Sequence, residues 1–555
     1  MSRILPAVCL LAACAGQPGA DIVVLGRVWT GDSAAPWAQG VAIRGDSVVA
    51  VGDSGTIAAM VGRQTTVLAA PGGFVAPGFM DDHVHLRWGG FQLASVDLRD
   101  ATSPEELTRR IKAFAATLQP GEWITGGDWD HEKWPGTPLP DRSWIDSVTP
   151  SNPVFVQRLD GHMALANSRA LAAAKLDRSM KDIPGGTIIR RSDRELTGVF
   201  KDEAMNPVLA VIPEPSPSQL DSALARALRH AGSLGVVGVS SVSTDWADIA
   251  ALERARARGA LTLRVSNHIP LASWRSMAES VRVHGPGDDW IRTAGVKGFV
   301  DGSLGSTTAL MFNPYRDAPA TRGLFVTPED SLRAWIGSAD SAGIQVAVHA
   351  IGDRANGLLL DIYDSVTRAH GARDRRFRIE HAQHLRQQDI PRFGAMGVIP
   401  SMQPYHAADD GRWAWKRIGP DLIKGTYAFR TLLDTGARLT CGSDWTVAPL
   451  DPRVGIQAAV TRQTLDGKNP EGWVPEQKIT VEDALRCYTA NNAYAMFGER
   501  RRGVLKPGYL ADLVVLDRDL TRIPATTIAE ARVLTTIVGG KVVYGGARDS
   551  GLGAR

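Results

Sequence analysis

Apolar residues form two patterns along the chain. Near both ends, short β-branched runs are separated by Gly and Asp turns, at residues 22–25, 41–43 and 48–51 and again at 512–516 and 535–544. Because the two ends are alike in composition, we expect residues 21–73 and 501–546 to form one small composite β-sandwich domain. The alternative is a pair of unrelated sheets.

The central body, residues 74–500, alternates apolar strands with segments of helical periodicity. The eight candidate strands are residues 74–80, 236–242, 262–267, 295–300, 345–349, 377–381, 398–402 and 438–441, with helical patterns at 218–234, 330–342 and 356–370 among them. Strands joined by helical crossovers predict an α/β protein with a (β/α)8 TIM-type barrel, whose reactive groups lie at the C-terminal ends of the strands.

The connection after the first strand is too long for a loop. It covers residues 86–235 and carries strand-like patterns of its own at 123–129 and 153–157. Connections of this length without internal structure are uncommon in compact domains. We therefore expect a long insertion that covers the barrel mouth.

Charge and hydropathy exclude several classes of protein. Lys and Arg number 62 against 59 Asp and Glu, a formal charge of +3 with no basic block, which argues against a nucleic-acid partner. No internal stretch reaches the roughly 18 apolar residues of a membrane span. A small-molecule substrate is the expected partner, and the sequence leaves open whether the chain forms a homo-oligomer.

The first 20 residues resemble a bacterial secretory signal that ends in a lipobox, Leu-Ala-Ala-Cys, at Cys14. We expect lipidation of Cys14 and export to the cell envelope, with the lipid as the only membrane anchor. Ala15 rather than Asp follows the cysteine, which favours the periplasmic face of the outer membrane. The alternative is a simple signal peptide cut near Ala20.

Two cysteines remain outside this leader, Cys441 and Cys487. Two widely spaced thiols give no disulfide framework. Cys441 lies within an apolar strand, so we expect it to be buried and inert.

Groups that bind metals follow four of the predicted barrel strands. His83 and His85 lie two residues apart at the end of the first strand and therefore face the same side. His349, His381 and Asp444 follow the fifth, sixth and eighth strands. If the strands form a barrel, all five groups converge on one mouth, and imidazole and carboxylate together suit a divalent metal such as zinc.

Lys297 lies within the apolar fourth strand, where a charged ammonium is costly to bury. One interpretation pairs it with Asp301 or Asp444. The other makes it a neutral amine that captures carbon dioxide as a carbamate and bridges two metal ions. We favour the carbamate, because an ammonium beside divalent cations would be repelled.

These motifs resemble the amidohydrolase superfamily, through Pro-Gly-Phe-Met-Asp-Asp-His-Val-His at residues 77–85, the Lys297 strand, His349, His381 and Gly-Ser-Asp at 442–444. Arg-Leu-Asp-Gly-His at 158–162 and Asn-Ser-Arg-Ala-Leu at 167–171 resemble amidohydrolase family 3 more narrowly, a group that includes N-substituted formamide deformylases. The resemblance implies one or two divalent ions, zinc in particular. It places His83 and His85 on one ion and His349 and His381 on the other, with carbamylated Lys297 as the bridge and Asp444 as a ligand that also moves the proton.

The resemblance also implies the reaction. We expect hydrolysis of a non-peptide C–N bond, in an N-acyl or N-formyl amine or a related amide, by metal-activated water with Asp444, Lys297 and His381 as catalytic groups. From the insertion, Arg158, Asp160, His162 and Trp129 are expected to contact the substrate, although His162 could instead cap the turn after Gly161. The same site could hydrolyse lactones, esters or phosphotriesters. A binding lipoprotein with a purely structural metal is disfavoured, because such a site needs no proton shuttle.

Overall fold

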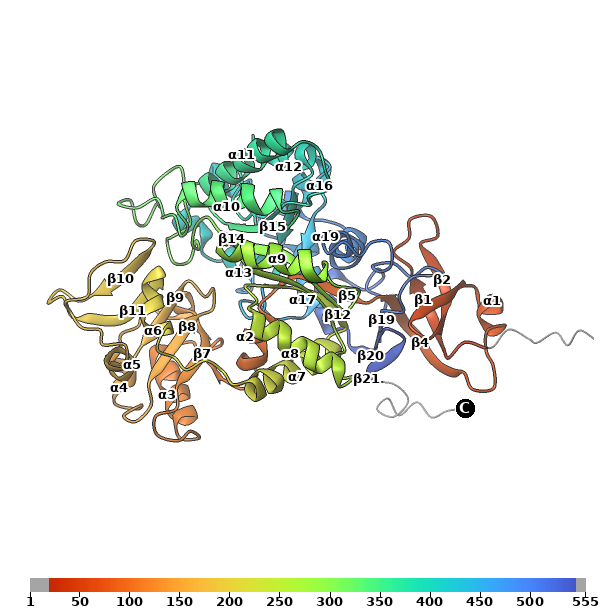
Figure 1. The fold of residues 1–555 in the computed structure, drawn as a ribbon, viewed down its shortest axis with the longest axis horizontal. Coiled ribbons are helices and arrows are strands. Elements are labelled where there is room, and N and C mark those ends of the chain that lie inside the picture. Colours follow the sequence, from red (N-terminus) through yellow and green to blue (C-terminus); the bar gives the residue numbers. More distant parts are fainter. Residues whose placement is uncertain (1–18, 546–555) are drawn as a thin grey trace, which may run out of the picture.

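The computed structural model describes residues 19–545; residues 1–18, which include Cys14, and residues 546–555 lie outside the described part. Three parts follow one another along the longest axis in Figure 1. A separate sheet with its helices lies at one end, a barrel lies in the centre, and a sheet built from both ends of the chain lies at the other end. Within residues 19–545, no helix has the length and apolar character needed to cross a membrane.

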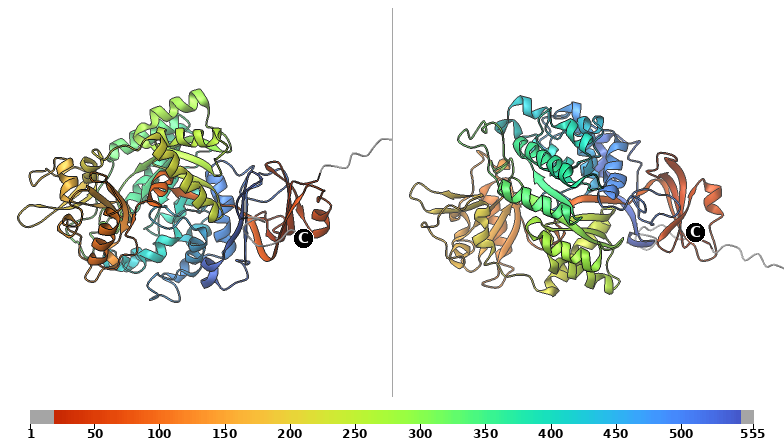
Figure 2. Two further views of the ribbon diagram at one scale, coloured as in Figure 1. Left: turned by 90° about the horizontal axis from the view of Figure 1, so that it is seen from below. Right: turned by 45° about the horizontal axis from the view of Figure 1, so that its top comes forward.

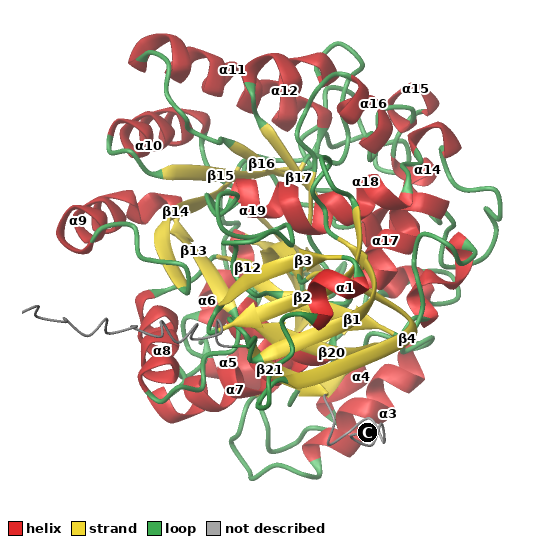
Figure 3. Ribbon diagram, turned by 90° about the vertical axis from the view of Figure 1, so that its right-hand side faces the viewer, coloured by secondary structure: helices red, strands yellow, loops and turns green. Residues whose placement is uncertain are grey.

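The two ends of the chain share one sheet. Its strands are β1 (Ile22–Trp29), β2 (Trp37–Arg44), β3 (Ser47–Gly52), β4 (Thr66–Pro77), β19 (Leu513–Leu516), β20 (Val533–Val538) and β21 (Lys541–Gly545), in the order β21-β20-β19-β4-β1-β2-β3. β4 joins the two halves by pairing antiparallel with β19. Figure 3 looks onto this sheet with the barrel behind it. Both ends of the chain therefore contribute to one terminal sheet, and it is a single seven-stranded sheet where a β-sandwich was expected.

The central body is an eight-stranded parallel barrel, as predicted. Its strands are β5 (Phe79–Val84), β12 (Val236–Val242), β13 (Arg264–Pro270), β14 (Ile291–Phe299), β15 (Gln345–Ala350), β16 (Arg378–His381), β17 (Ile399–Met402) and β18 (Thr440–Cys441). Neighbours in this order pair in parallel. The last and first strands meet through two backbone hydrogen bonds, from Asp444 N to His83 O (2.8 Å) and from His85 N to Trp445 O (2.6 Å).

Helices surround the barrel in the two further views of Figure 2. They include α7 (Pro217–Ser233), α8 (Trp246–Ala257), α9 (Trp274–His284), α10 (Glu329–Ser341), α11 (Asp353–His370), α12 (Ile390–Met396) and α17 (Pro452–Thr461). In α7, a capping box at Ser216 and Gln219 satisfies the first-turn N–H groups, and Leu220, Leu224 and Leu228 face the core at helical spacing. The amphipathic pattern thus predicts which face α7 buries.

The predicted first strand, residues 74–80, is divided between two sheets. Its first half belongs to β4 of the terminal sheet, and its second half begins β5 of the barrel. The division falls at Gly78, where an added Cβ would lie 2.3 Å from a Val237 methyl group. Only glycine lets the chain pass this close to β12 as it crosses from one sheet to the next.

The long connection after β5 contains a second mixed sheet. Its strands are β6 (Val96–Asp97), β7 (Ile124–Trp129), β8 (Val154–Arg158), β9 (Met163–Ala166), β10 (Gly186–Arg190) and β11 (Leu196–Asp202), in the order β10-β11-β9-β8-β7-β6. Helix α3 (Pro104–Ala115) buries Leu107 and Ile111 against it. We call residues 86–216 the insertion.

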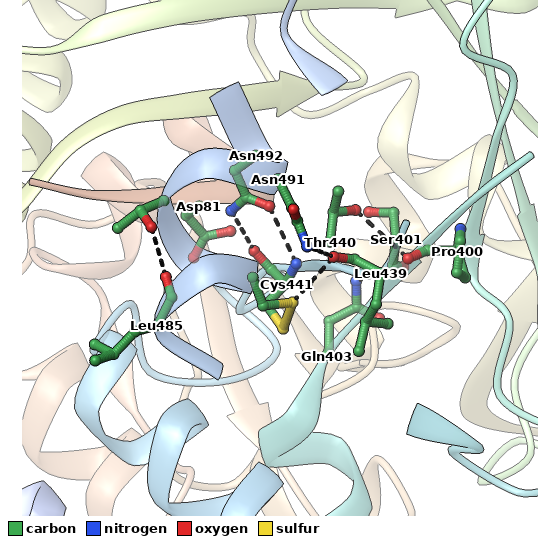
Figure 4. Close-up of a disulfide and its surroundings, with 12 residues drawn as sticks. Asp81, Pro400, Ser401, Gln403, Leu439, Thr440, Cys441, Leu485, Asn491 and Asn492 are labelled. Atoms are coloured by element: carbon green, nitrogen blue, oxygen red, sulfur yellow. Dashed lines mark hydrogen bonds between the residues drawn. A yellow bond between two sulfur atoms is a disulfide. The ribbon is translucent and has the colours of Figure 1, made fainter. Parts of the chain in front are cut away.

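A disulfide joins Cys441 of β18 to Cys487, with Cα atoms 5.3 Å apart (Figure 4). The expectation that these cysteines stay unpaired is therefore wrong. Cys487 begins a π-helical turn, residues 487–491, that packs against β18, and sequence spacing does not reveal this contact. The next residue, Asn492, donates to the carbonyl oxygens of Met80 and Cys441 (2.7 Å each). Both links hold β18 in place just before the loop that carries Asp444.

Candidate metal centre

The first strand and the loop after the last strand bring three predicted ligands together. Asp444 Oδ1 lies 3.3 Å from His83 Nε2 and 3.2 Å from His85 Nε2. These three side chains form a group able to hold a metal ion. Gly442 makes the approach feasible, because a Cβ there would lie 2.7 Å from Asp81 Oδ1 and from the His83 backbone nitrogen. Asp444 itself adopts a left-handed backbone with φ of 58°, a conformation that is concentrated at functional sites.

A second group shares the same carboxylate. His381, His406 and Asp444 place ligand atoms within 4.8 Å of one another. His381 donates from Nδ1 to Gln403 Oε1 (2.8 Å), so its Nε2 carries the lone pair. Asp444 therefore lies between two histidine pairs, as expected of a ligand shared by two ions.

Unpartnered buried atoms show that the described residues fit a metal. His83 Nε2, His406 Nε2 and Asp444 Oδ1 are buried and make no hydrogen bond to the part of the chain that the structure describes. Burying polar atoms without partners is costly unless a ligand satisfies them. Burial also lowers the pKa of His83 to about 4, so that its ring is neutral and offers a lone pair. Nitrogen and carboxylate donors of this kind suit zinc and related divalent ions.

A buried charge network orients His83. Its Nδ1 donates to the Glu380 carboxylate, which leaves Nε2 directed at Asp444. Glu380 in turn accepts a 2.7 Å hydrogen bond from Arg378 Nε, and Arg378 also pairs with Asp82 at 3.0 Å. All four side chains are fully buried. Outer partners of this type fix the tautomer and the ring orientation of a metal-binding histidine.

His349 belongs to neither group, and it lines the same cavity as Lys297 and Asp444. His349 donates from Nε2 to the Gly302 carbonyl (3.0 Å), which leaves Nδ1 with the lone pair, and its ring centroid is 4.5 Å from that of His381. Lys297 Nζ lies 4.4 Å from the centroid of the Phe299 ring. Burial lowers the pKa of Lys297 to about 8.

Asp301 is not the partner of Lys297. Its carboxylate instead accepts backbone hydrogen bonds from Leu310 (2.7 Å), Ile351 (3.0 Å) and Gly352 (2.8 Å). No ion pair joins Lys297 to a carboxylate within residues 19–545, although Glu380 and Asp444 are close enough to favour its charged form. Asp301 therefore does not serve as the ion-pair partner of a charged Lys297, which was one of the two partners considered from the sequence.

A cavity of about 280 Å³ lies over these groups. Barrel residues Lys297, His349, His381 and Asp444 line one side of it, and residues 157–162, Met205 and Leu209 of the insertion line another. Trp413 and Asp410, from the segment after β17, complete the wall. The insertion therefore covers the metal-binding groups and limits the space open to a substrate.

Three of the four residues predicted to contact substrate line this cavity. Arg158 is held between Asp160 (2.7 Å) and Asp130 (3.0 Å), and Asp160 also accepts from Ser303 Oγ (2.6 Å). Burial opposes the Asp160 carboxylate, but Arg158 lowers its pKa to about 2. His162 donates from Nδ1 to Asp202 (2.6 Å). Its imidazole is therefore held by a carboxylate rather than capping the turn after Gly161.

Trp129 is the fourth of these residues, and its predicted contact with substrate is wrong. Its indole is fully buried in the core of the insertion and donates to the Val156 carbonyl (2.8 Å). It stacks on Trp134, with ring centroids 6.0 Å apart. Trp129 ends β7 of the insertion, as expected, but its side chain packs into the hydrophobic core of the insertion and not into the cavity.

Sequence reasoning missed His406, Glu380 and Asp202. His406 lies four residues after β17, which was predicted as a strand. The search for metal-binding groups at the C-terminal ends of barrel strands would have found it if the search had continued further past the end of each strand. Glu380 adjoins His381 on β16 and carries the same signal. Asp202 ends β11 of the insertion, and no local pattern connects it to His162, which is 40 residues earlier.

Comparison with known proteins agrees with this site. The family profile named Amidohydro_3, described as an amidohydrolase family, matches residues 66–544. The protein LONG AFTER FAR-RED 3 of Arabidopsis thaliana is 39% identical over 95% of this chain and 92% of its own length. An N-substituted formamide deformylase of Arthrobacter pascens is 27% identical over 94% of this chain and 98% of its own. The crystal structure of an uncharacterized metal-dependent hydrolase from Pyrococcus horikoshii superposes with a TM-score of 0.73, at 28% identity, over 91% of this chain and 99% of that one.

Proposed function

The chain belongs to amidohydrolase family 3 and is a metal-dependent hydrolase of the amidohydrolase superfamily, and we propose that it cleaves a non-peptide C–N bond in an N-acyl or N-formyl amine. The observation that carries the proposal is Asp444, a carboxylate that is shared by two histidine groups and lines the cavity. The Arthrobacter relative, named as a formamide deformylase, supports the choice of an amide.

We propose that the metal is zinc, as one or two ions. His83, His85 and Asp444 would hold the first ion, and His381 and His406 would hold the second together with the same carboxylate. His349 Nδ1 and a Lys297 carbamate are further candidate ligands, since both side chains are buried beside these groups. When bound, a divalent ion lowers the pKa of water and polarises the scissile carbonyl.

Asp444 is suited to move the proton. Burial opposes its ionised form, but the neighbouring His83 and His85 keep its pKa below the usual value. The carboxylate can therefore accept a proton from the attacking water as the oxygen–carbon bond forms. Delivered to the amide nitrogen as the C–N bond breaks, the same proton turns a poor leaving group into a neutral amine.

The insertion contributes the walls of the site. Arg158 and Asp160 neutralise each other and are fixed by Asp130 and Ser303, so the wall facing the barrel is rigid. Met205, Leu209 and Trp413 supply apolar contact. A cavity of about 280 Å³ suits a compact amide rather than a polymer.

Matched pairs of compounds test this proposal. N-acyl and N-formyl amines, and the esters and lactones of the same carbon skeletons, should be assayed on zinc-loaded protein. We expect amide turnover to exceed ester turnover, and Asp444→Asn to abolish both while still binding metal. Asp421→Asn is a matched control, because the Asp421 side chain is almost fully exposed. Ester or lactone turnover far above amide turnover would overturn the amide assignment and leave the hydrolase assignment intact.

We further propose that the protein is exported and anchored through Cys14. The Cys441–Cys487 disulfide supports this, because disulfides persist in oxidising compartments outside the cytosol. Cys14 lies outside the described residues, so the anchor itself is tested by cell fractionation. Cys14→Ala should move the protein from the membrane fraction to the soluble fraction; wild-type protein already soluble and starting near Asp21 would favour a simple signal peptide.

A further inference from the structure

We infer that Asp202 is a positioning residue for His162, and that the pair directs His162 Nε2 at the carbonyl oxygen of the substrate. The inference rests on the proposed function, since it assigns a role within the same cavity. Asp202 belongs to the insertion and lies in neither of the metal-binding groups. Through Asp202, the insertion would take part in the reaction and would not only line the cavity.

The geometry of the pair determines which ring nitrogen is available. Asp202 Oδ1 lies 2.6 Å from His162 Nδ1, and the Asp202 side chain is 1% exposed against 16% for His162. Nε2 makes no hydrogen bond to any other described residue, and the ring lines the cavity. The buried carboxylate therefore holds the imidazole from behind, while the second nitrogen is left for a ligand.

Backbone strain marks the same residue. Asp202 has φ of 49° and ψ of −129°, a conformation that only glycine adopts easily. Two contacts hold it there. The Asp202 N–H donates to the His162 carbonyl (3.1 Å), and neighbouring Lys201 donates from Nζ to the Ser306 carbonyl of the barrel (2.8 Å). Strain persists at a position only where the surrounding structure imposes it, which here keeps the carboxylate on His162.

The barrel loop that carries Gly302 packs closely against this carboxylate. Gly302 follows β14, and a Cβ at that position would lie 2.0 Å from Thr308 Oγ1 and 2.9 Å from Asp202 Oδ1. The same Gly302 carbonyl accepts the hydrogen bond from His349 Nε2. Glycine therefore lets the insertion dyad approach the loop that orients His349, and the His162 and His349 ring centroids are 5.0 Å apart.

This position suits a donor to the reacting carbonyl. Asp202 accepts from Nδ1 and Asp160 accepts from the His162 backbone N–H (3.2 Å), so the ring and its backbone are both held while the ring lines the cavity. When Nε2 carries a proton, it can donate to the carbonyl oxygen, on which negative charge develops when water adds to the carbon. A preorganised donor of this kind stabilises the transition state more than the bound substrate, so its loss lowers kcat more than it raises KM.

A double-mutant cycle tests the pair. His162→Asn, Asp202→Asn and the double variant should be assayed on zinc-loaded full-length protein with the matched amide and ester panel. Glu203→Gln is the control, since it changes an adjacent carboxylate whose partner is Asn206 and not His162. We expect His162→Asn to lower kcat on the order of 10²-fold, with KM within about threefold of wild type. Asp202→Asn should lower kcat by at least about tenfold, and the double variant should be no slower than His162→Asn alone.

A readout that needs no substrate accompanies the cycle. In histidine-labelled protein, the imidazole ¹⁵N signals of His162 can be assigned by their absence from His162→Asn. Asp202→Asn should shift these signals, while Glu203→Gln should not. Unchanged His162 signals in Asp202→Asn, or losses in kcat that multiply in the double variant, would overturn the inference. If wild-type protein cleaves esters and no amides, the amide assignment fails while the cycle, run on the esters, still decides the role of Asp202.

Discussion

Glu380 accepts a hydrogen bond from His83 Nδ1 deep in the barrel, and this contact joins β16 to β5 beneath the candidate metal site. Arg378 holds the other side of the same carboxylate, so Glu380 stays ionised although it is fully buried. The pair gives His83 a single tautomer with Nε2 free. Without Glu380, the ring could rotate or move its proton to the nitrogen that faces Asp444.

We therefore expect Glu380→Gln to weaken metal binding by about 10- to 100-fold, the usual effect of losing an outer partner of a histidine ligand. Metal content after dialysis against graded chelator concentrations measures the change. Glu329→Gln on the exposed face of α10 is the matched control. Metal retention equal to wild type in a folded Glu380→Gln protein would show that Glu380 serves only to balance the charge of Arg378.

Metal removal should destabilise the protein. A ligand that binds only the folded state adds about 2.7 kcal/mol of stability when its free concentration is 100 times the dissociation constant. Chelation should therefore lower the melting temperature and abolish hydrolysis, and added zinc should restore both. His85→Ala, which removes a ligand whose side chain is 21% exposed, should reduce the zinc-dependent shift, whereas His284→Ala at the exposed end of α9 should not. Activity that survives chelation in metal-free protein would contradict the metal assignment.

Carbamate formation at Lys297 should depend on pH. Carbon dioxide reacts with the neutral amine, and burial lowers the pKa of Lys297 to about 8. The neutral fraction of such an amine is about 90% at pH 9 and a few per cent at pH 6.5, so carbamate should accumulate as the pH rises. ¹³C spectra of metal-free protein in ¹³C-bicarbonate would measure it, with Lys297→Met lacking the signal and Lys541→Met retaining it. Equal signals at both pH values, or none at pH 9, would favour an unmodified lysine.

Burial and periodicity explain which parts could be predicted from sequence. β12 has the predicted bounds because its valine-rich sequence, Val-Val-Gly-Val-Ser-Ser-Val, lies between a glycine and a polar turn, and all seven of its residues are buried. The predicted first strand spans two sheets because residues 74–80 are apolar on both sides of Gly78, and only the contact with Val237 shows where the chain changes sheet. The local pattern of apolar and polar residues does not reveal such contacts between distant segments.

In the candidate site too, some residues could be predicted from local sequence and others depend on contacts between distant segments. His83, His85, His349, His381 and Asp444 lie at or near the ends of barrel strands, and the strand ends were visible as apolar runs. The dyad of His162 with Asp202 joins a turn to the far end of β11. The contact of Cys441 with Cys487 arises from a π-helical turn that packs against β18. Both pairs depend on tertiary packing, so spacing along the chain could not identify them.

The disulfide gives a prediction about stability. Its half-cystines are 46 residues apart, and closing a loop of this length removes entropy from the unfolded chain worth about 4 kcal/mol in the chain-entropy account. The Cys441→Ser/Cys487→Ser variant should therefore lose up to about that much free energy of unfolding. Denaturant titration measures the loss, and peptide mapping without reduction should recover the two cysteines as one linked peptide. Two free thiols in the purified exported protein would contradict the pairing.

Ion pairs between the insertion and the barrel provide the last prediction. Glu132 of the insertion is 4% exposed and contacts Lys416 (3.2 Å) and Arg417 (2.9 Å), which follow β17. Arg417 also donates to the Gly305 carbonyl at the cavity wall (3.3 Å). Because charged hydrogen bonds contribute about 1.5–3 kcal/mol each, Glu132→Gln should loosen the insertion by about 2 kcal/mol without touching any metal-binding group.

We expect this variant to raise KM, to speed proteolysis of the insertion and to retain its metal, with Glu105→Gln on the exposed side of α3 as the control. Adding salt to the wild-type protein should raise KM and speed proteolysis less than Glu132→Gln does, since Glu132 and Arg417 are largely shielded from solvent. If Glu132→Gln lost metal while its proteolysis pattern stayed unchanged, the insertion would be acting on the ligands directly, and its role as a cover held by ion pairs would have to be abandoned.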